Sequence, residues 1–347
     1  MKFFLTGHTG FKGAWLLTLL SELGHEVVGF SDSVESGSLH EITNCASLVT
    51  ENYTGDVRDI RSLKSALNDS EPDFLIHLAA QSLVRRSYLE PANTFEVNVG
   101  GTINVLAAGR ECTSVKGALI VTTDKVYAPN STKVPHHESD PLQGFDPYSS
   151  SKALADQYVQ EWIKHANTFP IGIARAGNVI GGGDICADRL VPEVFRSMDI
   201  PRDIELRFPH AVRPWQHVLD CLAGYIGICA HIMRTGKSGV WNIGPDQGSY
   251  TQVYQICEKL IALNNSSISW RALTNDNLPE SDFLSLDTRK AKLELEWSNM
   301  LSLDESLLWT SRWYTEVKGG ESPHNVVISQ IKKYTEILNK KEIYFGI

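Results

Sequence analysis

The sequence predicts an α/β fold in which helices cover both faces of a doubly wound parallel sheet, followed by a smaller C-terminal lobe. The first observation is an apolar strand at Lys2–Thr6 that runs through a glycine-rich turn directly into an apolar helical segment. The second is the regular alternation of short apolar segments with longer helical ones over the first half of the chain. After about Ala176 this alternation ends, which indicates that a differently built lobe begins there.

The expected elements of the first part follow one another as a series of β-α-β units. Strands are expected at residues 2–6, 26–30, 48–53, 73–77, 118–122 and 171–175, and helices at residues 14–23, 59–68, 91–112 and 148–166. In the second part we expect helices near 192–198 and 218–235, a strand at 239–243, a polar stretch at 275–285, and a terminal helix at 325–340 after a loop at 316–323. Because doubly wound sheets bind ligands at the carboxyl ends of their strands, polar residues that follow a strand are the site candidates.

The composition is that of an ordinary globular protein, with 42% hydrophobic and 21% charged residues in a chain of 347. A formal net charge of −9 argues against nucleic acid as a partner. No apolar run approaches the roughly 20 residues that span a bilayer, and the first strand follows Met1 directly. We therefore expect no membrane segment, no signal peptide and a cytoplasmic location. The six cysteines lack metal-binding spacing and are expected to be reduced thiols, and no metal site is predicted.

The turn after the first strand carries three glycines, Gly7, Gly10 and Gly13. Gly7 allows a tight turn, Gly10 lets the backbone approach a pyrophosphate, and Gly13 lets the helix pack closely on the sheet. The phosphates would then lie at the helix N-terminus, where the backbone dipole favours negative charge. The turn therefore predicts a dinucleotide site, to which the intervening residues Thr9, Phe11 and Lys12 also belong.

An acidic residue after the second strand of such a fold usually meets the adenosine ribose. Asp32 is the candidate, but Ser31 precedes it, so its carboxylate comes one place later than expected. The preference for NAD over NADP is thus less firmly predicted than the dinucleotide site itself. We assign residues 1–177 to a dinucleotide-binding domain, to which later segments return, and residues 178–347 mainly to a substrate-binding lobe.

A second pattern lies at the start of the helix expected at 148–166. Tyr148 and Lys152 are four residues apart, so in a helix they share one face, and the ammonium can lower the pKa of the phenol from its free value of about 10. The fifth strand leads into Thr123, Asp124 and Lys125, which bring a hydroxyl, an acid and a base to the same edge of the sheet. The combination predicts an enzyme in which Tyr148 acts as a base near neutral pH.

Taken together, these motifs resemble those of the extended short-chain dehydrogenase/reductase family, whose cofactor domain is Rossmann-like, and within it those of the CDP-glucose 4,6-dehydratases. The matching segments, in the family's order over residues 1 to about 310, are Thr6–Gly13, His77–Gln81, Leu83–Tyr88, Thr123–Lys125, Asp146–Tyr148, Arg175–Asp184 and Arg213–Leu219. The Thr-Asp-Lys triplet is the specific part, because the related dTDP-glucose dehydratases carry Thr-Asp-Glu there. One departure is the stretch at 128–137, which replaces a tryptophan-containing segment and leaves the exact sugar open.

The resemblance implies NAD as the cofactor and adds residues to its site. Those expected along the cofactor after the third and fourth strands are Asp56, Val57, Leu78, Ala79 and Ala80. From the residues alone, Asp56 is as readily a turn aspartate as a ligand of the adenine. Lys152 would also bond the nicotinamide ribose, and Thr123 would bond the 4-oxygen of a sugar beside Tyr148.

Asp124 and Lys125 separate a dehydratase from simpler enzymes of this fold. A C4 epimerase needs only tyrosine, lysine and a hydroxyl donor. Loss of water from C5 and C6 also needs one group to remove the C5 proton and another to protonate the leaving hydroxyl. Asp124 is the expected acid, and Lys125 either removes the proton as a lysine of lowered pKa or stabilises the enolate as a cation.

An anionic substrate needs local basic groups in a chain of negative net charge. Arginine matches a diphosphate with two parallel hydrogen bonds, and a glycine loop at 181–183 can bring backbone amides to phosphate oxygens. The residues expected at the substrate are Gln81, Arg85, Arg86, Asn178, Arg189, Arg207, Arg213 and His217. We expect His77 to be a core histidine, and His136 and His137 to be solvated because they lack metal-binding spacing.

The sequence is therefore interpreted as that of an NAD-dependent nucleotide-sugar 4,6-dehydratase of the CDP-glucose type, acting in deoxysugar and lipopolysaccharide biosynthesis. Hydride would leave C4 for bound NAD, water would leave across C5 and C6, and the hydride would return to C6. The open alternatives are a dehydratase of a GDP- or UDP-linked sugar, a C4 epimerase and, in a different class, a non-catalytic dinucleotide-sensing protein. The resemblance also implies a homodimer in which the helices at 91–112 and 148–166 form a four-helix bundle.

Overall fold

The computed structural model describes residues 1–129, 133–166, 168–246, 250–273, 278 and 281–341. Within these residues a seven-stranded sheet, with neighbouring strands parallel, forms the centre of the protein. The strands lie in the order β11 (Gly239–Ile243), β6 (Ile171–Ala176), β5 (Gly117–Val121), β4 (Phe74–His77), β1 (Lys2–Thr6), β2 (Glu26–Ser31) and β3 (Glu51–Thr54). The strand order reverses between β1 and β4, and at such a switch point an open α/β sheet forms a crevice for ligands.

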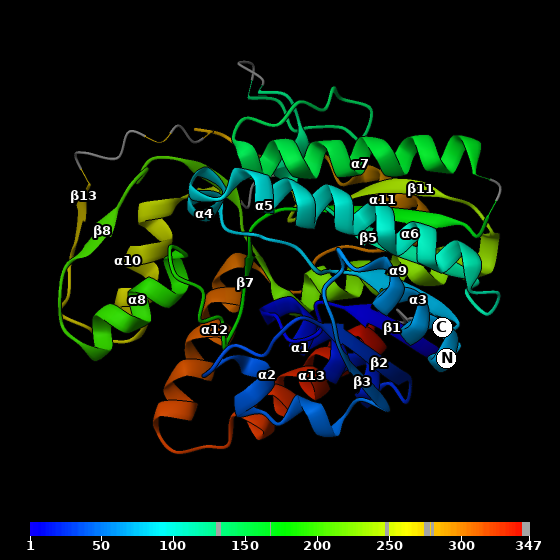
Figure 1. Cartoon of the computed structure of the whole chain (residues 1–347). Coiled ribbons are helices and arrows are strands. Elements are labelled where there is room, and N and C mark those ends of the chain that lie inside the picture. The colour runs from blue at the N-terminus through cyan, green and yellow to red at the C-terminus, as the bar shows by residue number, and fades with distance from the viewer. Residues whose placement is uncertain (130–132, 167, 247–249, 274–277, 279–280, 342–347) are drawn as a thin grey trace.

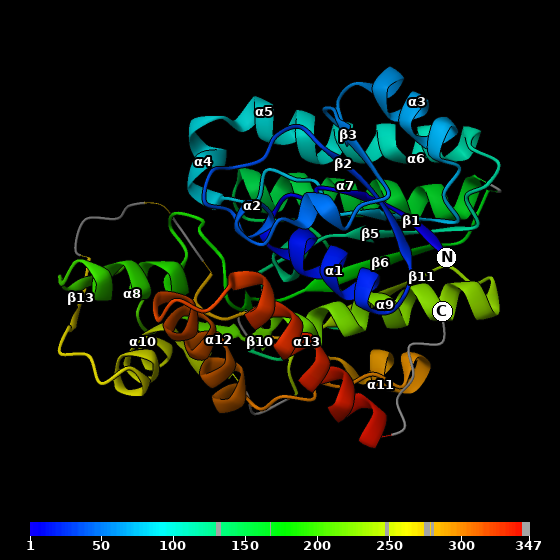
Figure 2. The same ribbon diagram turned by 90° about the horizontal axis from the view of Figure 1, so that it is seen from below.

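Helices cover both faces of the sheet (Figures 1 and 2). One face carries α3 (Ile60–Ser70), α7 (Pro147–His165), and a continuous helical segment made of α5 (Pro91–Phe95), a π-helical turn (Glu96–Gly100) and α6 (Gly101–Glu111). The other face carries α1 (Phe11–Glu22), α9 (Val218–Thr235) and α13 (Pro323–Lys340), with α11 (Arg289–Leu295) beside α9. α9 is long and apolar enough to cross a membrane, but 67% of it is buried inside the protein, where it forms part of the core.

The alternation of side chains along β1 explains why two cores form. Phe3 and Leu5 point into the core beneath α1 and α9, whereas Phe4 points into the core on the side of α3 and α6. β4 and β5 are buried along their whole length, as expected of parallel strands whose sheet is covered on both faces. The carboxyl ends of these strands are thereby held rigidly at one edge.

The second lobe stands at that carboxyl edge, to the left in Figure 1. Its elements are α8 (Leu190–Asp199), β8 (Ile204–Leu206), β9 (Val212–Pro214), β12 (Tyr250–Gln252), α10 (Val253–Leu263), β13 (Trp270–Ala272) and α12 (Leu303–Lys318). The shorter elements are α2 (Leu39–Ile42), α4 (Val84–Leu89), β7 (Val179–Ile180), β10 (Gln216–His217) and two 3-10 turns, Cys45–Ser47 and Asp124–Val126. The lobe has its own apolar core, centred on residues such as Val194, Ile256 and Leu307.

The predicted α/β class with a doubly wound parallel sheet is confirmed, with local differences. β3 begins at Glu51 rather than at residue 48, because a 3-10 turn occupies residues 45–47. α4 was not predicted, and the long helix expected at 91–112 contains the π-helical turn. α9 and β11 come from beyond residue 177 and yet pack on or in the sheet. The polar stretch at 275–285 and the replaced stretch at 128–137 lie partly outside the described residues.

Candidate functional site

A pocket of about 1280 Å³ lies along the carboxyl edge of the sheet and extends beneath the second lobe. Its walls come from the glycine turn after β1, from the ends of β2 to β5, from the start of α7 and from residues 176–215. All the residues predicted for the site line this pocket except Lys152 and His217. Side chains that are far apart in the sequence are thus brought to one cavity.

The glycine turn brings the backbone so close to its neighbours that two of its positions leave no room for a side chain. Gly7 has a φ of +74°, and a Cβ on it would lie 2.6 Å from the backbone nitrogen of Ala79. A Cβ on Gly13 would lie 2.1 Å from the carbonyl oxygen of Gly7, so both positions admit only glycine. Gly10 begins α1 without a side chain that caps the helix, and it lines the pocket. The first amides of α1 are therefore available to an anion, and the turn fits a dinucleotide.

The residues expected at the adenosine end lie at the rim of the pocket. Asp32 is exposed there, whereas Ser31 is buried and places its hydroxyl 2.9 Å from Nδ1 of His8. Asp56 accepts two bonds from Nε of Arg58, at 3.0 and 2.9 Å, and this interaction lowers the pKa of Asp56. The carboxylate of Asp56 is thus held in place by its neighbour in the chain.

The Thr123–Asp124–Lys125 triplet forms a 3-10 turn at the end of β5. The hydroxyl of Thr123 accepts a bond from the backbone of Lys125 at 3.3 Å and lies 3.0 Å from Oδ1 of Asp124. Asp124 is only 2% exposed, and its Oδ2 has no hydrogen-bond partner among the described residues. Burial raises the pKa of Asp124, although Lys125 opposes the shift. A carboxyl group whose pKa is raised in a pocket binds a proton more readily and is better suited to act as a general acid.

Tyr148 lies in the first turn of α7, where the local sequence fixes it. Asp146 and Ser149 form a capping box, and the backbone nitrogen of Tyr148 donates to the hydroxyl of Ser87 at 3.1 Å. The phenol is in hydrogen-bond contact with the hydroxyl of Thr123. The triplet and the tyrosine therefore meet in the pocket, as the sequence predicted.

The predicted lowering of the pKa of Tyr148 by Lys152 is wrong for this structure. Burial raises the pKa of Tyr148 to about 12, and the contact with Thr123 offsets only part of the shift. Lys152 does not line the pocket, because its ammonium donates to the carbonyl of Val121 at 3.1 Å instead. Burial, assisted by the nearby charge of Lys12, lowers the pKa of Lys152 to about 7. Helical spacing placed the two residues on one face, but it did not bring their polar atoms together.

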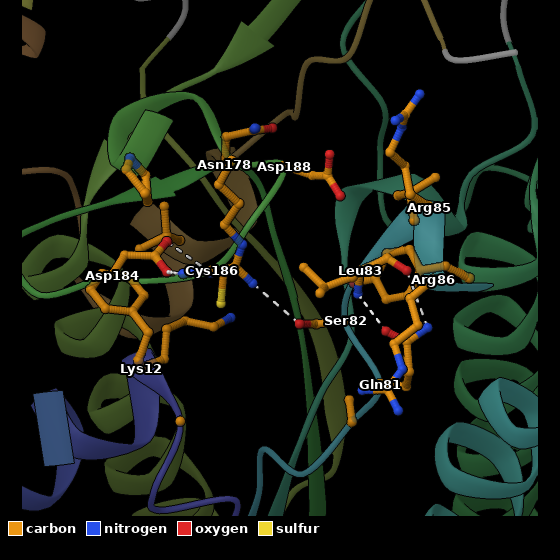
Figure 3. A pocket seen from close by; sticks show the side chains of 18 of the residues that line it. Lys12, Gln81, Ser82, Leu83, Arg85, Arg86, Asn178, Asp184, Cys186 and Asp188 are labelled. Carbon is orange, nitrogen blue, oxygen red and sulfur yellow. Dashed lines mark hydrogen bonds and ion pairs between the residues drawn. The ribbon is translucent and has the colours of Figure 1, made fainter. Parts of the chain in front are cut away.

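Basic side chains lie on both walls of the pocket (Figure 3). Arg189 pairs with Asp184 at 2.9 Å and reaches across to the hydroxyl of Ser82 at 3.2 Å. On the same wall as Asp184, Lys12 donates to the hydroxyl of Tyr225 at 3.0 Å. The cavity is therefore bordered by cations despite the negative net charge of the chain.

The other predicted substrate residues differ in the partners that their polar groups have within the protein. Arg207 pairs with Asp188 at 3.0 Å, and Arg213 is buried and donates to the carbonyl of Val212 at 2.9 Å. Arg85 and Asn178 also line the pocket.

Two residues of the opposite wall are engaged with their own loop. The side chain of Gln81 bonds the backbone of Leu83 and the hydroxyl of Thr94, at distances from 2.7 to 3.1 Å, and so it braces the loop after β4. Arg86 pairs with Glu90 at 3.1 Å on the surface of α4.

Three histidine predictions have different outcomes. His77 is a core histidine, as predicted, since its ring nitrogens contact the hydroxyls of Thr6 and Thr102. His217 is wrong as a substrate residue, because its ring is buried between Trp15 and Trp309 outside the pocket. His136 is not solvated but buried.

The glycine loop at 181–183 is explained by packing rather than by access to phosphates. A Cβ on Gly182 would lie 1.9 Å from the ring of Trp313, and Gly183 has a φ of +77° against Leu39. Only Gly181 of the three lines the pocket. The reasoning from sequence also missed a buried pair, Asp156 and Arg175, because the two residues lie on different elements and no local pattern joins them.

Comparison with known proteins places the chain in a family. Residues 3–244 match the model of the NAD dependent epimerase/dehydratase family. CDP-glucose 4,6-dehydratase of Salmonella typhimurium is 37% identical over 332 residues, which cover 92% of this chain and 92% of that protein.

Solved structures share the fold. A UDP-glucose 4-epimerase of Thermotoga maritima has a TM-score of 0.80 at 22% identity and covers 92% of this chain and 100% of its own. A dTDP-glucose 4,6-dehydratase of Streptomyces venezuelae has a TM-score of 0.80 at 24% identity, with coverages of 93% and 100%. On the family match and the bacterial relative, this chain is a member of the NAD dependent epimerase/dehydratase family.

Proposed function

We propose that the protein is a CDP-glucose 4,6-dehydratase that converts CDP-D-glucose to CDP-4-keto-6-deoxy-D-glucose. The observation that carries the proposal is a buried acid, Asp124, beside Lys125 and within reach of Tyr148 in one pocket. A C4 epimerase has no need of such an acid. The bacterial relative of that name, similar over 92% of both chains, supports the same substrate.

NAD is the proposed cofactor, and the glycine turn is its proposed pyrophosphate site. The backbone of Gly7 and Gly10 and the free amides of α1 would hold the phosphates, and Asp32 and Asp56 would lie along the adenosine. When bound, NAD⁺ supplies a hydride acceptor for C4 of the sugar and a positive charge near Tyr148.

Oxidation at C4 is assigned to the contact between Tyr148 and Thr123. Tyr148 removes the proton of the 4-hydroxyl while the hydride leaves C4, and Thr123 bonds the 4-oxygen. In the protein alone the pKa of Tyr148 is about 12, and the positive charge that NAD⁺ would supply near Tyr148 would favour the phenolate. Lys152 is held at the carbonyl of Val121 outside the pocket, so no role in this step is assigned to it.

Elimination of water is assigned to Asp124 and Lys125. The 4-ketone makes the C5 proton acidic, and Lys125 either removes it or stabilises the enolate. Asp124 donates its proton to the 6-hydroxyl, so that water leaves and a C5–C6 double bond forms. C6 would then receive the hydride that NAD would hold, C5 would regain a proton from Lys125 or from solvent, and the overall reaction is redox-neutral.

The diphosphate of the substrate is assigned to the cationic walls of the pocket. Arg189, Arg207 and Arg213 are the proposed ligands from the second lobe, and Arg85 on α4 is the proposed ligand from the other wall. Asn178 would add an amide. Gln81 and Arg86 would shape the wall, since their polar groups already bond the loop and Glu90.

The proposal is tested by incubating the protein with NAD and a panel of CDP-, GDP-, dTDP- and UDP-linked sugars. We expect CDP-glucose to lose the mass of one water, and the reaction in D₂O to place deuterium at C5. The hydrogen delivered to C6 should come from C4 of the same molecule. Loss of water from another nucleotide sugar would assign that sugar as the substrate instead. Inversion at C4 without loss of water would favour an epimerase. No reaction with any of them would favour a non-catalytic dinucleotide sensor.

We further propose a cytoplasmic homodimer that serves deoxysugar and lipopolysaccharide biosynthesis. The dimer would pair α5–α6 and α7 of two copies in a four-helix bundle, since these helices lie side by side on one face of the sheet. The six cysteines of the chain are free thiols, which suits a reducing compartment.

A further inference from the structure

An ion pair lies buried between α7 and β6, outside the pocket. Arg175 on β6 and Asp156 on α7 are both 0% exposed. The guanidinium holds the carboxylate with two bonds, from Nε to Oδ2 at 2.9 Å and from Nη2 to Oδ1 at 2.8 Å. This planar fork fixes the distance and the angle between the helix and the strand.

The carboxylate of Asp156 connects the two elements that carry the proposed catalytic groups. Asp156 lies one helical turn after Lys152 and two turns after Tyr148 on α7. Its Oδ2 accepts a bond from the hydroxyl of Thr122 at 2.9 Å, and Thr122 immediately precedes Thr123 in the triplet. Asp156 thus joins the helix that holds Tyr148 to the strand end that holds Asp124.

The guanidinium of Arg175 holds the other end of the triplet. Its Nη1 donates to the hydroxyl of Tyr127 at 2.9 Å, and its carbon lies 4.9 Å from the centre of the Tyr127 ring. That hydroxyl donates in turn to Oδ1 of Asn242 on β11 at 2.6 Å. The ring of His136 stacks on Tyr127 with centroids 4.6 Å apart. The triplet is therefore anchored just before it at Thr122 and just after it at Tyr127.

A buried ion pair is weak evidence for stability, because desolvation of both charges opposes their attraction and apolar residues often replace such pairs without loss. What this pair supplies is a fixed geometry between α7 and β6. We propose that Asp156 and Arg175 are positioning residues that hold Thr123 and Asp124 in register with Tyr148. The inference rests on the proposed dehydratase reaction for its kinetic consequence. A displacement of about 1 Å between reacting groups can slow a reaction about 10²-fold.

The decisive comparison is Thr122→Val against Thr122→Ser. Valine keeps the shape of the side chain and removes the bond to Asp156, whose Oδ2 stays paired with Arg175, so no buried polar atom is stranded. Serine keeps the hydroxyl and loses a methyl group. We expect valine to lower kcat about ten- to a hundredfold with KM and NAD affinity nearly unchanged, and serine to retain most of kcat. A merely structural role predicts instead that both variants lose some stability, valine through the lost hydrogen bond and serine through the lost methyl group, while their kcat values stay alike.

A second measurement does not depend on turnover. Hydrogen exchange of the segment that holds Thr123–Val126 should become faster in Thr122→Val and in Tyr127→Phe, but not in Thr122→Ser, while global unfolding stays within a few degrees of wild type. Tyr127 lies outside the pocket, so its variant cannot act by touching the substrate.

The outcomes separate the two proposals. Equal kcat and equal exchange in the valine and serine variants would overturn the positioning role while the dehydratase remains. A wild-type protein that dehydrates no nucleotide sugar would overturn the proposed reaction, and the exchange measurement would then decide alone whether the pair fixes the triplet.

Discussion

Replacement of Asp124 by asparagine tests the step that separates a dehydratase from an epimerase. Asparagine has nearly the same shape, and its carbonyl can accept the bond that the hydroxyl of Thr123 gives to Oδ1 at 3.0 Å. What disappears is the acidic oxygen Oδ2, which has no hydrogen-bond partner among the described residues and is the proposed proton donor. Oxidation at C4 should therefore continue, because Tyr148 and Thr123 are unchanged.

The size of the effect follows from the role of the acid. A positioned general acid contributes about 10²- to 10⁴-fold, so the loss of water should slow by that factor. If oxidation is barely affected, reduced nicotinamide accumulates on the enzyme to nearly one equivalent per site. Its absorbance reports the stalled step in a single turnover, and mass spectrometry reports the missing product. Asp69→Asn, on the surface of α3, controls for the loss of a carboxylate elsewhere.

The Asp124→Asn variant should also differ from wild type in how its stability depends on pH. The pKa of Asp124 is raised by burial, so the folded state binds a proton that the unfolded state has released. Stability of the wild type therefore falls as pH rises from the ordinary aspartate pKa of 3.8 through the raised one. The Asp124→Asn variant lacks this fall, so its melting temperature should exceed that of wild type increasingly as pH rises from 3.8 through the raised pKa. A variant that eliminates water at the wild-type rate, or that accumulates no reduced cofactor while product is lost, would refute the role of Asp124.

Three further variants test the remaining assignments. Tyr148→Phe should keep NAD and substrate binding and lose about 10²- to 10⁴-fold in turnover, and near-normal rates would remove the central claim. Arg213→Ala should raise KM about ten- to a hundredfold with a smaller effect on kcat, and an unchanged KM would make Arg213 structural. Lys152→Met should be more stable than wild type below pH 7, and this difference in stability should vanish as pH rises to 10.5. The reason is that the pKa of Lys152 is lowered from 10.5 to about 7 in the folded protein, so wild-type stability rises between these two pH values. Melting curves that keep a constant difference at all pH values would show that Lys152 is not neutralised in this way.

The sequence predicted those features that depend on the spacing of residues along the chain. Gly7 and Gly13 were identified correctly because a strand, a tight turn and a helix leave no room for a Cβ at either position. The meeting of the triplet with Tyr148 was also foreseeable, since both follow elements of one parallel sheet. β3 was misplaced at its start because the local propensity of residues 48–50 did not reveal the preceding 3-10 turn.

Features that depend on distant packing were not predictable. His217 was predicted to be a ligand because an arginine and a tryptophan lie near it in the sequence. In the structure, Trp309 on α12 and Trp15 on α1 enclose its ring. The pKa of Tyr148 followed burial rather than the helical neighbour, and burial is decided by elements that lie far away in the chain. His136 seemed solvated because nothing near it in the sequence shows that it stacks on Tyr127.

The proton balance of the proposed reaction gives Thr123 a second role, beside its bond to the 4-oxygen. In each cycle Tyr148 gains the proton of the 4-hydroxyl, and Asp124 loses one to the departing water, so the site returns to its starting state only when a proton passes from the tyrosine to the aspartate. The hydroxyl of Thr123 contacts both groups, at 3.0 Å from Oδ1 of Asp124 and in hydrogen-bond contact with the phenol. The raised pKa of Asp124 favours its reprotonation, and a protonated Asp124 no longer raises the pKa of Tyr148. Recovery of the acid therefore also restores a tyrosine that ionises more readily for the next substrate.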